Sequence, residues 1–178
     1  MKKGMFLILI LGCVFLSCSK DQSTNDTYYY LTCTIDGVPR TFNLLAGSRK
    51  ETNGVNTAVF VHGVESASAN TADYGFVITN LPSGNEIVAA DYPDTSTDFE
   101  ILTTYQADQS SLGFEAGTTV VEEANMAGVT ISNHFKVSIT SINTETIKGT
   151  FSGDFFEDGD PHAAKKTISN GSFYLKFQ

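Results

Sequence analysis

Apolar and polar residues alternate along most of the chain from Tyr28 onward, and this pattern constrains the fold more than any other feature. A side-chain period of two residues is typical of a β-strand with one buried and one solvent-facing side, whereas a helix repeats every 3.6 residues. In residues 29–35 the alternation places Leu31, Cys33 and Ile35 on one face. Because no stretch sustains a helical period, we expect an all-β domain.

Turn residues divide this pattern into about ten short strands. Asp36-Gly37 lies between two alternating runs and predicts a tight hairpin, because both central residues of a type I′ turn need a positive φ. Residues 106–128 alternate poorly, and we interpret residues 120–126 as a strand with a loop rather than as a helical turn. The other expected strands span residues 29–35, 38–44, 57–64, 74–79, 86–90, 99–105, 135–140, 147–155 and 173–177.

A single antiparallel β-sandwich is the fold that this pattern favours. A closed, lipocalin-like barrel is the alternative, because a barrel shows the same alternation. Gly149 and Gly153 share the buried face of a strand with Phe151, and their missing side chains leave room for rings such as Phe173. Residues 170–171, Asn-Gly, are expected to form a bulge or bend before the last strand.

The first 18 residues carry the pattern of an exported lipoprotein. Two lysines precede an apolar run at residues 4–16, which is shorter than the ~20 residues of a membrane-spanning helix. Residues 15–18, Phe-Leu-Ser-Cys, resemble the lipobox of signal peptidase II substrates, although that pattern prefers Leu where Phe15 stands. The resemblance implies that residues 1–17 are a signal peptide and that Cys18 is lipidated.

Two parts of the domain resemble small secreted lipoproteins of the Bacteroidota. One is residues 29–39, with an Ile-Asp-Gly turn, and the other comprises residues 137–142, 147–153 and 168–173. That group consists largely of domains of unknown function. The resemblance implies an all-β fold and a membrane anchor, carries over no catalytic residue, and does not extend to residues 111–133.

Residues 19–27 contain no apolar side chain, so we expect a flexible tether between the anchor and the domain. The expected organisation is a signal peptide at 1–17, the lipidated cysteine and tether at 18–27, and one all-β domain at 28–178. We expect the lipid to anchor the domain in the cell envelope, at the outer membrane. In the lipoprotein group that this chain resembles, surface export accompanies an acidic run after the cysteine. Residues 19–22 carry one acid, so periplasmic and surface-exposed positions both stay open.

Acidic residues outnumber basic ones by 20 to 11, which gives the chain a formal net charge of −9. Loss of residues 1–17 would remove two lysines and leave nine basic residues against 20 acidic ones, a net charge of −11. Binding to nucleic acid needs clustered Lys and Arg, so we expect no nucleic acid partner. Apart from the lipidated Cys18, the mature chain would keep Cys33 as its only cysteine. We therefore expect no disulfide, and alternation places Cys33 in the core.

No catalytic or metal-binding motif stands out, and we expect neither an enzyme nor a resident cofactor. His62, His134 and His162 are far apart and lack the spacing of zinc motifs. Two acidic stretches, residues 91–98 and 154–160, offer the carboxylates that calcium prefers, but neither has the spacing of an EF-hand. Asp, Gly and Pro are also ordinary turn residues, so turn formation is the favoured interpretation and calcium binding is the alternative.

We expect a non-catalytic domain with a structural or binding role. Two alternatives stay open: a glycan-binding module, and a barrel that holds a small apolar ligand. Glycan sites use flat aromatic rings, and this chain has seven Tyr and no Trp. The candidate ligand-binding residues are Tyr28 and Tyr30, on the face opposite Cys33, and Tyr92, which we expect to be exposed in the acidic stretch 91–98. The membrane is the expected partner through Cys18, and the sequence leaves a glycan or a protein partner open.

Overall fold

The computed structural model describes residues 28–54, 56–68, 70–81, 85–108 and 111–178. The signal peptide, the lipidated Cys18 and the tether that the sequence predicts lie outside these residues. Within the described ranges, no helix is both long enough and apolar enough to cross a membrane.

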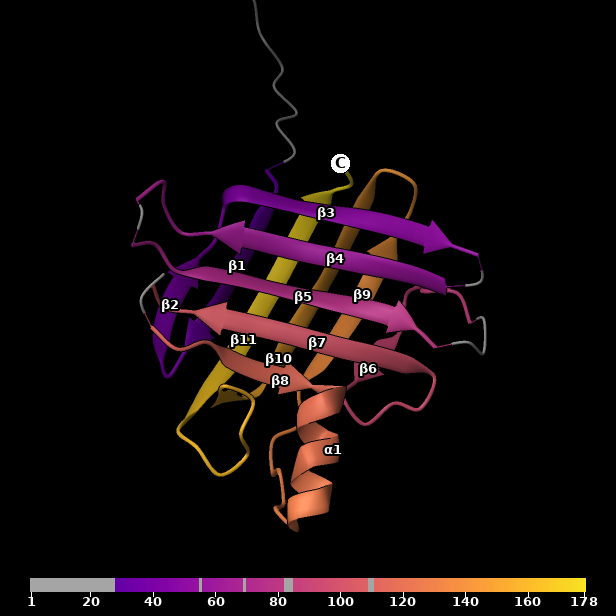
Figure 1. The fold of residues 1–178 in the computed structure, drawn as a ribbon. Helices are drawn as coiled ribbons and strands as arrows, with labels where there is room; N and C mark the ends of the chain where they lie inside the picture. Colours follow the sequence, from indigo (N-terminus) through magenta and orange to yellow (C-terminus); the bar gives the residue numbers. More distant parts are fainter. Residues whose placement is uncertain (1–27, 55, 69, 82–84, 109–110) are drawn as a thin grey trace, which may run out of the picture.

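Strands make up most of the described part of the chain, and one helix accompanies them there (Figure 1). The strand ladders all run antiparallel, which confirms the predicted all-β, antiparallel class. In chain order the elements are β1 (Tyr30–Ile35), β2 (Val38–Thr41), β3 (Leu44–Asn53), β4 (Asn56–Val64), β5 (Asp73–Asn80), β6 (Asp91–Pro93), β7 (Phe99–Gln106), β8 (Phe114–Gly117), α1 (Thr118–Ala127), β9 (Lys136–Ile142), β10 (Thr146–Glu157) and β11 (Lys165–Lys176).

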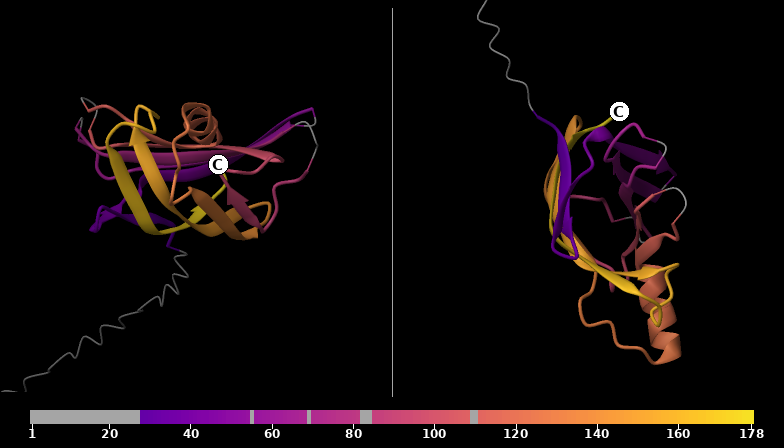
Figure 2. Two further views of the ribbon diagram at one scale, coloured as in Figure 1. Left: turned by 90° about the horizontal axis from the view of Figure 1, so that it is seen from below. Right: turned by 90° about the vertical axis from the view of Figure 1, so that its left-hand side faces the viewer.

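The strands belong to one continuous sheet rather than to the two separate sheets of a sandwich. Its order in the described residues is β2-β1-β11-β10-β8-β7-β5-β4-β3, with β9 attached to β10 and β6 to β9. Figures 1 and 2 show that the layer of β1, β11, β10 and β9 crosses the layer of β3, β4, β5 and β7. The sheet is therefore curled into a half-barrel, and the predicted β-sandwich is wrong at this level.

β10 produces the curl because it belongs to both layers. Residues 147–152 of β10 pair with β9, whereas Phe156 and Glu157 pair with β8. At the changeover Gly153 has a φ of 151° and lies against the backbone of Phe135, where no side chain would fit. Gly153 and the next three residues are all buried. Alternation stops here because the strand passes between the layers and has core on both sides.

β2 and β3 end the path, and the described residues show no ladder between these two strands. β3 instead meets the residue after β11 at one point, where Ser48 and Phe177 form an isolated parallel bridge. The closed barrel that the sequence left as an alternative is therefore not formed.

Aromatic rings fill the space between the two layers. The Phe151 ring stacks on Tyr74 with a centroid distance of 4.8 Å and an interplanar angle of 14°. A Cβ on Gly149 would lie 2.6 Å from the ring of Phe173, so this glycine leaves room for the ring as predicted. Cys33 is buried in the same core, as predicted, and burial raises the pKa of its thiol to about 12. The interior is thus filled by side chains, as protein cores generally are.

The predicted hairpin holds, while two strand predictions fail. Asp36 and Gly37 have φ values of 49° and 82°, which confirms the turn between β1 and β2. β3 spans Leu44–Asn53, where the sequence predicted a strand that ends at residue 44. Its second half carries polar residues on both faces, so no apolar period marks it. Residues 86–90, predicted as a strand, have no strand structure.

Thr118–Ala127 form helix α1, so the strand that we predicted around residues 120–126 is wrong. Ten residues make fewer than about three turns, too few for a helical period to stand out in the sequence. Gly128 ends the helix with a φ of 69°. One side of α1 is buried in a small separate cluster, made of Val120, Val121, Ala124, Ile131 and Phe156.

Candidate functional site

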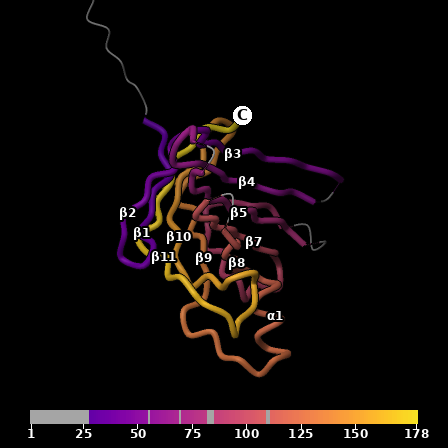
Figure 3. The backbone as a smooth tube through the Cα atoms, turned by 60° about the vertical axis from the view of Figure 1, so that its left-hand side comes forward, coloured from indigo at the N-terminus to yellow at the C-terminus, as the bar shows by residue number. Residues whose placement is uncertain are grey.

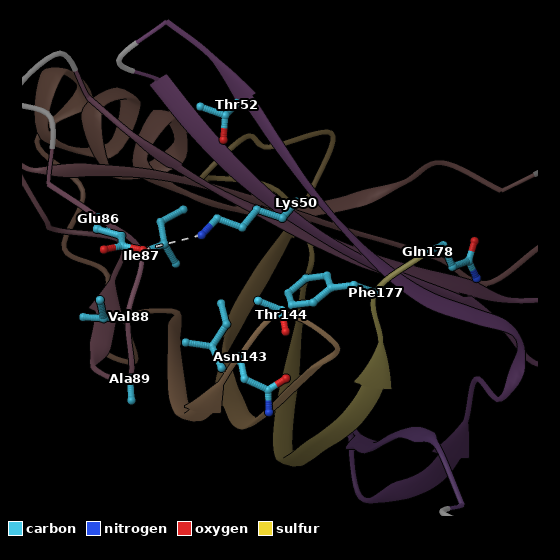
Figure 4. Close-up of a pocket in the computed structure, with 11 residues that line it drawn as sticks. Lys50, Thr52, Glu86, Ile87, Val88, Ala89, Asn143, Thr144, Phe177 and Gln178 are labelled. Carbon is cyan, nitrogen blue, oxygen red and sulfur yellow. Dashed lines mark ion pairs between the residues drawn. The ribbon is translucent and has the colours of Figure 1, made fainter.

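An open groove lies at the edge of the half-barrel, between the two layers (Figure 4). Its volume is about 670 Å³, and it combines apolar side chains that reach into the core with polar side chains at its rim. β3 forms one wall, the segment before β6 forms another, and the β9–β10 turn with residues 177–178 forms the third. The lining residues are Lys50, Thr52, Glu86, Ile87, Val88, Ala89, Ile142, Asn143, Thr144, Phe177 and Gln178.

β3 supplies the basic side of the groove. Ser48 is buried on the inner face of this strand, and Lys50 and Thr52 follow on the same face because strand side chains alternate. Figure 3 shows β3 and β4 extending beyond the rest of the sheet. The inward positions at residues 50 and 52 therefore face the groove instead of the packed interior.

Phe177 places an aromatic ring in the groove. Its amide donates a 2.8 Å hydrogen bond to the carbonyl of Glu145, and the Gln178 amide donates a 2.9 Å bond to the carbonyl of Ser48. The Ser48 hydroxyl in turn donates a 3.1 Å bond to the carbonyl of Lys176. These bonds tie this segment to the β9–β10 turn on one side and to β3 on the other. Phe177 is thus held where the third wall of the groove meets β3.

Tyr92 supports the wall before β6 from inside the core. The residue is 1% exposed, and its ring meets Phe99 edge-on at a centroid distance of 4.9 Å. Its hydroxyl donates to the carbonyl of Val88 and accepts from the Val88 amide, both at 2.8 Å. The prediction that Tyr92 is exposed is therefore wrong, because pairing of β6 with Val137 on β9 turns the ring inward. Tyr92 fixes the position of Val88 in the groove wall.

The β9–β10 turn gives the third wall a defined shape. The Asn143 side-chain oxygen accepts hydrogen bonds from the amides of Glu145 and Thr146, both at 2.8 Å. This closes the turn locally, a common use of Asn in such positions. Thr144, between these residues, is presented at the rim of the groove.

One ion pair crosses the mouth of the groove. The Lys50 ammonium lies 3.7 Å from a Glu86 carboxylate oxygen, as the dashed line in Figure 4 marks. The side chains of Lys50 and Glu86 are 37% and 74% exposed, so water screens the pair and it contributes little to stability. A polar ligand can therefore displace this pair at small cost.

The three candidate tyrosines do not come together in one site. Tyr28 is 71% exposed, and its hydroxyl accepts a 2.7 Å hydrogen bond from the Asn43 side-chain amide. Tyr30 is half-buried, with its ring centroid 6.5 Å from that of Tyr174 on the neighbouring strand. Neither Tyr28 nor Tyr30 lines the groove, and Tyr92 supports it only from behind.

The acidic stretch at residues 91–98 uses Asp94 to hold the backbone. One Asp94 oxygen accepts a 2.8 Å hydrogen bond from the Phe135 amide, and the other lies 2.9 Å from His134 Nδ1. Burial raises the pKa of the Asp94 carboxyl, although both of these contacts oppose the shift. The contacts fasten the end of β6 to the segment before β9.

Asp154, in the second acidic stretch, is also buried and fully engaged. It accepts hydrogen bonds from the Lys165 ammonium at 2.7 Å, the Thr167 hydroxyl at 2.8 Å and the Asn133 amide at 3.0 Å. Burial by itself would raise the pKa of this carboxyl, but the three donors outweigh it and the net pKa is lowered. Neighbouring donors thus occupy both buried carboxylates, and Asp154 lies within β10 rather than in a turn. In the described ranges, no three His, Cys, Asp or Glu side chains gather into a group that could hold a metal ion.

Sequence reasoning did not single out the groove residues. Lys50 and Thr52 lie on a strand that the sequence did not predict, and Thr144 lies in an ordinary turn. Phe177 ends the strand predicted at residues 173–177, where alternation gives it the same face as Phe173, like any other core residue. The sequence offers no signal for the groove residues on β3, because residues 48–53 are polar at every position. No protein-family model matches the chain, and no curated protein or solved structure is significantly similar to it.

Proposed function

We propose that this chain is an envelope lipoprotein, anchored in the outer membrane through Cys18, whose domain binds a carbohydrate in the groove without catalysing a reaction. The observation that carries the ligand class is the Phe177 ring, held in a groove whose rim bears hydrogen-bonding side chains. The anchor rests on the signal-peptide pattern of residues 1–18.

The chemistry of a sugar matches this lining. A sugar presents an apolar C–H face that packs on an aromatic ring and hydroxyls that both donate and accept hydrogen bonds. Phe177 and Ile142 offer the apolar contact, while Thr52, Thr144 and Gln178 offer polar partners. The groove volume of about 670 Å³ falls within the roughly 300–1,000 Å³ typical of small-molecule sites. Because the groove is open along the surface, a longer glycan can extend beyond it.

The same lining supports binding rather than hydrolysis. Glycoside hydrolysis ordinarily uses two carboxyl groups that face each other across the bond. Among the described residues that line the groove, Glu86 is the only carboxylate side chain, and it is 74% exposed and paired with Lys50. Side chains fill the interior of the half-barrel, so the groove is a better ligand site than the interior. This argues against the alternative of an apolar ligand inside a barrel.

A glycan array probed with the mature, folded protein tests the ligand class. For any glycan that binds, Phe177→Leu should weaken binding about two- to tenfold, because an aromatic contact contributes about 0.5–1.5 kcal/mol beyond the buried area. Thr144→Val should weaken it too, since it removes a rim hydroxyl with little change in volume. Thr150→Val is the matched control, because Thr150 is an exposed strand residue outside the groove.

Calorimetric titration gives the affinities, and circular dichroism checks that each variant folds. The proposed ligand class is wrong if no glycan binds to the folded protein. The groove is the wrong site if Phe177→Leu and Thr150→Val bind a glycan equally well.

A further inference from the structure

We infer that one end of the domain docks on the bilayer surface through Tyr28, Leu44 and Leu45, which we call the membrane-facing edge. This inference rests on the proposed anchor at Cys18 and is independent of the ligand in the groove. It adds a second contact with the membrane, made by the folded domain itself.

The membrane-facing edge consists of exposed, bulky side chains. Tyr28, Leu44 and Leu45 are 71%, 40% and 75% exposed. Asn43 joins them: its side-chain amide donates to the Tyr28 hydroxyl at 2.7 Å, and its side-chain oxygen accepts from the Leu31 amide at 2.9 Å. The start of the described chain and the start of β3 therefore lie side by side, as Figure 1 also shows.

Leu45 is held outward by an unfavourable backbone conformation. Its φ is 53°, in the left-handed region that a bulky residue rarely adopts. The pairing of β3 with β4 is interrupted at this point, between Leu44 and Gly47. The domain gains no burial in exchange, because the Leu45 side chain is exposed. Strain of this kind is found mainly at functional positions, and contact with lipid would supply the missing burial.

The short length of chain between Cys18 and the membrane-facing edge favours the bilayer as the surface that this edge contacts. Ten peptide steps separate Cys18 from Tyr28, and even a fully extended chain of that length reaches only about 35 Å. Once the lipid is inserted, the edge therefore stays at a high effective concentration near the surface, and a small contact is enough to dock it. Tyr and Leu suit this place, since Tyr pairs an apolar ring with a polar hydroxyl at the membrane interface.

Four acidic side chains far from this edge favour the same orientation. Glu122 and Glu123 on α1, and Asp158 and Asp160 between β10 and β11, lie at the opposite end of the molecule from the start of β3 (Figure 1). Docking through the membrane-facing edge keeps these carboxylates away from anionic lipid headgroups, which would repel them.

The absence of Trp from the sequence provides a clean test. We would place one reporter indole in the full, lipidated protein by Leu45→Trp and reconstitute it in phosphatidylethanolamine–phosphatidylglycerol vesicles. Its emission should shift to shorter wavelength, and brominated lipids should quench it. Met126→Trp is the matched control, because Met126 is 82% exposed on α1 at the far end, and its emission should stay that of an indole in water.

Each outcome separates the docking from the anchor. Equal emission and equal quenching for Leu45→Trp and Met126→Trp would overturn the docking, while mass spectrometry of the same sample shows whether Cys18 carries lipid. A shift of the Leu45→Trp emission that needs envelope proteins and is absent with lipid alone would also overturn it, in favour of a protein partner. If Leu45→Trp does not fold, Leu44→Trp gives the same comparison at a position without a positive φ.

Discussion

Replacing Phe151 with alanine removes a ring from the centre of the half-barrel. The Phe151 side chain is 3% exposed, stacks on Tyr74 at 4.8 Å and lies 6.3 Å from the ring centroid of Phe173. Its neighbour across the β10–β11 pair is Gly171, which has no side chain to move into the space. The cavity would therefore stay largely open, and little relaxation would offset the lost contacts.

Large-to-small substitutions of a buried Phe cost about 3–5 kcal/mol, and the poor relaxation here points to the upper half of that range, about 4–5 kcal/mol. With a typical urea dependence of about 2 kcal/mol per molar, the unfolding midpoint should fall by about 2 M. Circular dichroism during a urea titration measures it. Ser152→Ala is the control, since Ser152 is exposed on the other face of the strand and its loss should cost less than about 0.5 kcal/mol. Equal midpoints for the two variants would refute the assignment of the faces of β10.

Three further predictions concern the anchor, an ion pair and the groove wall. Cys18→Ala should abolish incorporation of a radiolabelled fatty acid, and label that persists would contradict the lipid anchor. The pKa of Asp154 is lowered in the folded state, so its ionised carboxyl stabilises the fold above the ordinary carboxyl pKa of about 4. This stabilisation is lost as the pH falls through the folded pKa. Asp154→Asn should therefore flatten the acid side of a plot of urea midpoint against pH. An unchanged acid limb would show that other carboxylates dominate it. Tyr92→Phe keeps the ring but removes both hydrogen bonds to Val88, so it should cost about 1–3 kcal/mol, at about 0.5–1.5 kcal/mol per bond, and speed hydrogen exchange at the Val88 amide. Unchanged exchange would mean that the hydroxyl does not hold the wall.

Local rules of sequence determined the class of the fold and the inner face of most strands. A period of two is a property of each strand taken by itself, which is why Cys33 and Phe151 could be placed in the core before any pairing was known. The Asp36-Gly37 hairpin follows from backbone sterics within two residues. The fit of Gly149 to the ring of Phe173 also followed, because it needs only the shared inner face.

The partners of the strands depended on the tertiary structure. Alternation says which side chains face inward, but not whether a strand pairs with one neighbour or with two. Along one edge β10 pairs with β9 at residues 147–152 and with β8 at Phe156 and Glu157, and this division turns the predicted sandwich into a half-barrel. This division requires Gly153 of β10 to fit against Phe135, which directly precedes β9. The pattern of either segment by itself does not predict this contact.

The groove and the position of Tyr92 were decided in the same way. Lys50 lies at an inward position of β3, beyond the end of the facing layer. It lines the groove only because β3 extends further than that layer, which the sequence does not show. Tyr92 follows an acid and precedes a proline, which is a pattern typical of an exposed loop. Its ring is buried because β6 pairs with β9, and that pairing joins segments more than 40 residues apart. Exposure is set by all the neighbours of a side chain, whereas a sequence pattern reports only those that are adjacent along the chain.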